Sequence, residues 1–146
     1  MRVVIQRVKE AQVKVDGQII GLIARGLLVF LGIARDDNKA CADGLIKKIM
    51  ELRIFEDAQG KMNVSAQETG AQYLIVSQFT LYGNCDKGRR PSFDEAADPV
   101  KGEELYDYFV AQLKATKAFV QTGKFRAMMD VALINDGPVT FIIDSK

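Results

Sequence analysis

Hydrophobic and polar residues alternate in short runs near the start of the chain, a pattern typical of β-strands. Residues 2–15 are rich in valine with polar residues interleaved, which predicts two short strands broken near Lys9-Glu10. Asp16-Gly17 predicts a hairpin turn, because both positions need positive φ, and residues 18–23 would form the returning strand. Residues 26–32 are apolar throughout and bounded by glycines, which is typical of a strand buried on both faces.

Two segments instead carry apolar residues at helical spacing. The first follows possible caps at Asp36-Asp37-Asn38 and is predicted to end at about Leu52. Its apolar positions are Ala42, Leu45, Ile46, Ile49 and Met50. The second is predicted to begin at Asp98-Pro99, where an N-cap precedes a proline at the first helical position.

The remaining apolar runs predict more strands. They cover residues 73–81, 129–134 and 139–143, with a loop over 82–98 and a turn at Asn135-Asp136-Gly137. Since hairpins dominate this order, we expect an α+β fold with a largely antiparallel, barrel-like sheet and flanking helices. No repeat or linker divides the sequence, so residues 1–146 are expected to form one domain.

The composition excludes several kinds of site. The chain has no histidine and only two cysteines, which excludes Ser-His-Asp and Cys-His nucleophile systems and a four-cysteine zinc site within one chain. The chain also has no dinucleotide-binding GxGxxG or P-loop fingerprint, and we expect neither a metal nor a cofactor. The formal net charge is only +1, so any site for a polyanion must be local. No signal peptide or membrane-spanning run is evident, and the protein is expected to be cytoplasmic.

Ser77-Gln78-Phe79-Thr80 lies where the strand predicted over 73–81 changes from apolar to polar. It is either an edge strand with one solvent-exposed face or a site where hydroxyl, amide and backbone N–H groups converge. Thr80 is a poor nucleophile without a histidine base, so backbone N–H groups that stabilise an oxyanion are the better use of this segment.

Two further motifs also have two interpretations. Asn135-Asp136-Gly137-Pro138-Val139-Thr140 is either an ordinary hairpin or a rigid display of backbone carbonyls, because Pro138 cannot donate to a strand ladder. Lys87, Arg89 and Arg90 lie in a glycine-containing loop, which is either solvated or a contact for nucleic-acid phosphates. Tyr82 and Phe93 flank this loop and could stack on bases, although core packing is the better interpretation for Phe93.

Together with residues 4–8, Val-Ile-Gln-Arg-Val, these motifs resemble the D-aminoacyl-tRNA deacylase family over essentially the whole chain. The resemblance implies a metal-independent homodimer that hydrolyses the ester between a D-amino acid and the terminal ribose of tRNA. It implies that residues 77–80 line the catalytic pocket, that Gly137-Pro138 is a cis dipeptide reaching the partner's pocket, and that Arg7 supports it. Phe125-Arg126-Ala127 departs from the family, in which many members have a smaller middle residue.

From this resemblance we expect the substrate ribose 2′-hydroxyl to assist hydrolysis. The alternative mechanism has Thr80 as a covalent nucleophile. Chirality would follow from a carbonyl wall at Gly137-Pro138 that leaves no room for an L side chain. Glycyl-tRNA, which has no side chain to exclude, should then be hydrolysed as well. The alternatives are a non-catalytic RNA-binding dimer and another esterase or amidase acting on aminoacyl or peptidyl groups.

Overall fold

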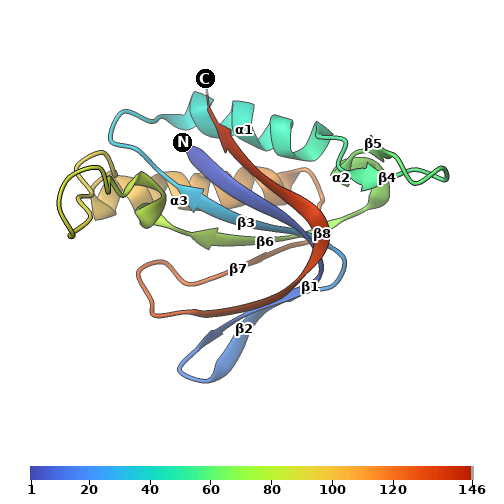
Figure 1. The fold of residues 1–146 in the computed structure, drawn as a ribbon, viewed down its shortest axis with the longest axis horizontal. Coiled ribbons are helices and arrows are strands. Elements are labelled where there is room, and N and C mark those ends of the chain that lie inside the picture. Colours follow the sequence, from blue (N-terminus) through green and yellow to red (C-terminus); the bar gives the residue numbers. More distant parts are fainter. Residues whose placement is uncertain (146) are drawn as a thin grey trace.

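A long curved strand organises the fold (Figure 1). In this computed structural model, which describes residues 1–145, six strands form one mixed sheet in the order β2-β1-β3-β6-β7, and β8 also pairs with β1. The strands are β1 (Arg2–Val15), β2 (Gln18–Ile23), β3 (Gly26–Gly32), β6 (Gln72–Ser77), β7 (Val120–Thr122) and β8 (Asp130–Asp144). β1 pairs antiparallel with β2, β3 and β8, whereas β6 pairs parallel with β3 and β7. The predicted α+β class and largely antiparallel sheet are confirmed.

The helices begin where the sequence predicts them. Asn38 caps α1 (Lys39–Glu51), and Asp98 caps α3 (Pro99–Ala115) by accepting from two backbone N–H groups. Side chains from both helices join those of β1, β3 and β6 in the larger core cluster. The short elements are β4 (Phe55–Glu56), β5 (Met62–Val64), α2 (Ala66–Thr69) and the 3₁₀ helix η1 (Phe79–Tyr82). No helix within residues 1–145 has the length and apolar character needed to cross a membrane.

A second, smaller core lies on the other face of the sheet. It contains Val13, Ile23, Leu28 and Leu74, so β3 and β6 are buried on both faces, as predicted for residues 26–32. The sheet curls until β2 approaches β7: a Cβ added at Gly21 would lie 2.7 Å from the Thr122 carbonyl oxygen. The barrel-like closure therefore needs a glycine at this point.

The predicted break near Lys9-Glu10 is wrong, because β1 continues through it as one strand. Both side chains are exposed. At this point the neighbour of β1 changes from β3 to β2, and its register with β8 shifts. The polar pair marks a change of partner rather than the end of a strand.

The predicted turn at Asn135-Asp136-Gly137 is also wrong. The segment is a bulge within β8, which runs as one strand along β1. Val8 pairs with Asn135 and Gln6 with Thr140, so four residues of β8 lie opposite one residue of β1. The Asn135 side-chain amide stabilises the bulge by donating to the carbonyls of Arg7 and Val139, each at 3.1 Å.

Candidate active site

The polar segment after β6 forms a tight turn. The strand ends at Ser77 rather than continuing to residue 81 as predicted, because the Gln78 N–H donates to the Leu31 carbonyl at 2.8 Å and the chain then folds back. The N–H groups of Leu81 and Gly83 donate to the carbonyls of Gln78 and Thr80, closing the 3₁₀ helix η1. Residues 77–80 therefore lie at the end of a buried strand, held by backbone hydrogen bonds.

Polar groups converge on this turn. The Gln78 side-chain amide donates to the Thr80 hydroxyl oxygen. The N–H groups of Phe79 and Thr80 have no acceptor within residues 1–145, whereas the N–H of Gln78 is already paired. Unpaired N–H groups at the start of a helical turn can bind a negative charge. The described residues contain no cluster of three or more potential metal ligands.

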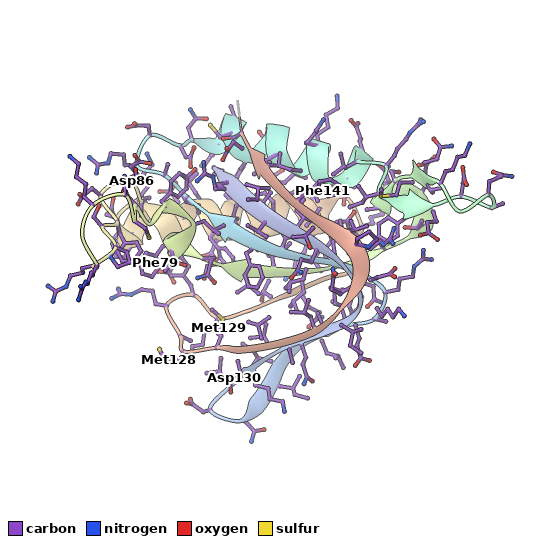
Figure 2. The ribbon with its side chains drawn as sticks, in the orientation of Figure 1. Phe79, Asp86, Met128, Met129, Asp130 and Phe141 are labelled. Atoms are coloured by element: carbon purple, nitrogen blue, oxygen red, sulfur yellow. The ribbon has the colours of Figure 1, made fainter. Side chains whose placement is uncertain are left out.

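Two cavities open on either side of this turn. Residues 77–79 line both, together with Phe125 and Arg126. The first, of about 400 Å³, reaches toward the N-terminus of α3, and the second, of about 420 Å³, toward Met128 and Met129. Figure 2 shows Phe79, Met128 and Met129 at the same end of the molecule. The turn is thus placed to contact a ligand occupying both cavities.

Aromatic side chains support the first cavity. Phe79 packs edge-on against Phe93, with ring centroids 5.0 Å apart. Phe125 packs against Tyr106, whose hydroxyl donates to the Ile75 carbonyl at 2.9 Å. Burial raises the pKa of Tyr106, so this hydroxyl remains a neutral donor. Contrary to the core packing expected from sequence, Phe93 is 37% exposed and lines the cavity.

Arg7 lies beneath the β8 bulge. It is 2% exposed, and its guanidinium donates to the carbonyls of Asp136 and Ile54 at 3.2 and 2.6 Å. It also forms an ion pair with the Asp136 carboxylate at 3.1 Å. The Gly137-Pro138 bond is cis and both residues are exposed. Neither residue lines either cavity, so within one chain the structure does not bring the bulge to the turn.

The basic loop lies close to the first cavity. Lys87, Arg89 and Arg90 are exposed, and Phe93 of the same loop is a cavity wall. Tyr82 is half-buried with the Arg2 guanidinium over its ring, and burial raises its pKa to about 12. Tyr82 is therefore already packed against Arg2.

Sequence reasoning missed some residues of the site. It gave no cavity role to Phe125, whose surroundings depend on contact with the distant helix α3. It also passed over Gly32, which ends β3 and leaves room for the turn: an added Cβ would lie 3.2 Å from the Gln78 carbonyl oxygen. The available signal was a glycine ending a buried strand.

The chain is similar to known proteins over nearly its whole length. The family model described as D-Tyr-tRNA(Tyr) deacylase matches residues 4–144. A D-aminoacyl-tRNA deacylase from Koribacter versatilis (strain Ellin345) is 56% identical, covering 100% of this chain and 98% of the relative. A solved structure titled c-Myc DNA Unwinding Element Binding Protein is 40% identical, with a TM-score of 0.94, covering 100% of this chain and 99% of the other. Another, of a probable eukaryotic D-amino acid tRNA deacylase, is 20% identical with a TM-score of 0.86 over 98% of each chain, and it shows the shared fold. The chain belongs to the D-Tyr-tRNA(Tyr) deacylase family of ester hydrolases.

Proposed function

We propose that residues 1–146 act as one cytoplasmic deacylase domain that hydrolyses the ester of D-aminoacyl-tRNA at the Ser77–Thr80 turn. The observation that carries this proposal is that residues 77–79 of the turn line both cavities, next to the unpaired backbone N–H groups of Phe79 and Thr80, although Thr80 itself lines neither cavity. One cavity would accept the aminoacyl group and the other the terminal adenosine.

The N–H groups of Phe79 and Thr80 would stabilise the oxyanion that forms when water attacks the ester carbonyl. One such donor is worth about 2.7–4 kcal/mol in the transition state. The Thr80 hydroxyl already accepts a hydrogen bond from Gln78, which makes its oxygen a weaker nucleophile. We therefore assign a proton relay to the substrate's own ribose 2′-hydroxyl: its oxygen accepts a proton from the attacking water while its own proton passes to the neighbouring ribose oxygen that leaves as the ester bond breaks, with Thr80 in a positioning role. This mechanism uses no metal or cofactor.

Selection against L-amino acids would depend on the backbone of Gly137-Pro138 from a second copy of the chain. The dipeptide is exposed on the β8 bulge and absent from the cavities of its own chain. Arg7 holds the bulge from below through the Asp136 carbonyl and carboxylate. A carbonyl wall held in this way would exclude an L side chain and leave glycine unhindered.

The outer face of β8 is suited to pair with a second copy. Ile134 and Ile142, which pair with Glu10 and Val4 and so share one face of the strand, are 50% and 69% exposed, and Phe141 on the opposite face is 38% exposed. Figure 2 shows Phe141 on the outer strand of the sheet, away from the labelled Phe79. An apolar stripe of this kind is typical of an interface between subunits. A two-fold pairing through it would give each subunit the other's bulge.

The deciding experiment incubates the purified protein with D-tyrosyl-, L-tyrosyl- and glycyl-tRNA in the presence of a chelator and follows loss of the ester. We expect rapid loss of the D and glycyl esters, with the L ester spared. If the D-tyrosyl ester is as stable as the L-tyrosyl ester, the proposed activity is refuted. Complete resistance of glycyl-tRNA would refute a purely steric screen.

The same assay applied to Gly137→Ala tests the screen itself. The added Cβ would lie 3.2 Å from the Asn135 side-chain oxygen. This contact is tight, but a small shift of the Asn135 side chain would relieve it. We expect loss of selectivity or of activity without unfolding, and the same for Pro138→Ala. If both variants keep wild-type selectivity, the dipeptide has no part in it.

A second candidate function is nucleic-acid binding without catalysis. It is favoured by the exposed cations at Lys87, Arg89 and Arg90 and by the 40% identical solved structure of a c-Myc DNA Unwinding Element Binding Protein. Binding of uncharged tRNA with steep salt dependence but no ester loss would support this candidate.

A further inference from the structure

Arg126 has an unusual backbone conformation beside the candidate active site. Its φ is 59°, in the left-handed region that glycine tolerates far better than a branched or long L side chain. Positions of this kind persist where the surrounding structure determines them, and they are concentrated at functional sites.

Arg126 lies where the two cavities meet. It lines both cavities, and it is the one cation among the described residues that line either. The one anion there, Asp98, accepts from the N–H groups of Val100 and Lys101 as the cap of α3. Within residues 1–145, Arg126 itself makes no ion pair or hydrogen bond through its guanidinium, and it is exposed. An unpaired guanidinium between two cavities is available to a ligand.

We propose that Arg126 binds a phosphodiester of the tRNA 3′ end where the strand enters between the two cavities. This inference rests on the proposed deacylase function. In that substrate the ester is neutral and the α-amino group is positive, so the guanidinium is attracted to the phosphodiesters and repelled by the amino acid. The planar fork of arginine also matches two phosphate oxygens.

The basic loop adds further cations near Arg126 at the edge of the first cavity. Phe93, from the loop that carries Lys87, Arg89 and Arg90, lines the same cavity as Arg126. Figure 2 shows Asp86 of this loop and Met128 of the segment after Arg126 at the same end of the molecule. A single-stranded RNA 3′ end that enters past this loop would reach Arg126 after the loop cations, next to the reacting ester. Arg126 would therefore determine how firmly the terminal nucleotide is held.

The test compares Arg126→Gln and Arg126→Lys with the wild type on D-tyrosyl-tRNA. Lys124→Gln is the matched control, because Lys124 is an exposed cation of the same segment that lines neither cavity. We expect Arg126→Gln to raise KM about tenfold with kcat nearly unchanged, as one charge-assisted contact is lost. The slope of log KM against log salt should fall by about 0.7, the share of one phosphate on a single strand. Arg126→Lys should have a KM and a salt dependence closer to those of the wild type, because it keeps the charge. Lys124→Gln should change KM less than about twofold.

A second substrate, the D-tyrosyl ester of adenosine without phosphate, separates this role from catalysis. We expect Arg126→Gln to hydrolyse it as fast as the wild type. Arg126→Gly, which relieves the unfavourable φ, should raise the melting temperature and show the same KM defect on tRNA.

An unchanged KM on tRNA, an equal loss on the phosphate-free ester, or a fall in kcat alone would each overturn the proposal. If the wild type hydrolyses D-tyrosyl-tRNA and Arg126→Gln matches it, only this inference fails. If the wild type hydrolyses no aminoacyl-tRNA, the proposed function fails and this inference with it.

Discussion

The close approach of Gly32 to the turn at residues 77–80 allows a test of how precisely that turn must be held for the proposed activity. A Cβ added at Gly32 would lie 3.0 Å from the Leu81 Cβ and 3.2 Å from the Gln78 carbonyl oxygen. Carbon atoms pack best at about 3.5–4.0 Å, so the Gly32→Ala variant needs a shift of about 0.5 Å. β3 is hydrogen-bonded to both β1 and β6, whereas η1 is a single short turn, so η1 should move.

The expected effect follows from that shift. A misplacement of about 1 Å can reduce catalysis about a hundredfold, so a shift of half that size should lower kcat/KM about tenfold. Overpacking should also reduce the free energy of unfolding by about 1–3 kcal/mol. We would measure kcat/KM on D-tyrosyl-tRNA well below the melting temperature, and stability by chemical denaturation.

Gly44→Ala is the matched control, because nothing lies within 4 Å of a Cβ added at this position in α1. It should raise stability by about 1 kcal/mol and leave kcat/KM unchanged. A folded Gly32→Ala protein with wild-type kcat/KM would show that η1 tolerates displacement, and the assignment of its N–H groups to the oxyanion would lose its geometric basis.

Three other substitutions test separate parts of the structure. Thr80→Ala should keep its single-turnover rate within about tenfold, whereas loss of a true nucleophile costs about 10⁶-fold; a rapid-quench measurement decides between them. Tyr73→Phe should raise stability by about 1 kcal/mol in thermal denaturation, because the Tyr73 hydroxyl is buried without a partner within residues 1–145. Burial raises the pKa of Tyr73 to about 12, above the unfolded value of 10.0. The free energy of unfolding should therefore decrease as the pH rises from about 10 to 12, and it should decrease less steeply in Tyr73→Phe. Gly26→Ala should yield no soluble folded protein on expression, because its Cβ would lie 1.9 Å from the Gln72 carbonyl oxygen.

Local chemistry was enough to predict part of the fold. The turn at Asp16-Gly17, the caps at Asn38 and Asp98 and the buried strand over 26–32 are all found in the structure. Each depends on residues close in sequence: positive φ at two positions, a side-chain oxygen facing nearby N–H groups, or a continuous apolar run. Such signals need no knowledge of distant partners.

Where distant residues decide, the sequence pattern was misleading. Asn135-Asp136-Gly137 has the composition of a hairpin turn, but the Arg7 carbonyl, which accepts from Asn135, makes it a bulge along β1. The strand predicted to reach residue 81 ends early because the Gln78 N–H pairs with Leu31. The roles of the candidate site residues remain predictions, although the structure places residues 77–79 at both cavities.

In the proposed function, selectivity would arise without a titratable side chain to provide it. The described residues lining the two cavities include one anion, used as a helix cap, and one cation at the boundary. The other polar groups at these cavities are neutral, namely the Ser77 hydroxyl, the Gln78 side-chain amide and backbone N–H groups, and together with the aromatic surfaces they distinguish ligands by shape and hydrogen bonding rather than by charge. A filter of this kind rejects what is too large in one direction, and it has no contact with which to reject what is smaller. Hydrolysis of glycyl-tRNA is therefore what we expect if the filter lies in the backbone, and a variant that loses the filter should gain hydrolysis of L-aminoacyl-tRNA while it still hydrolyses glycyl-tRNA.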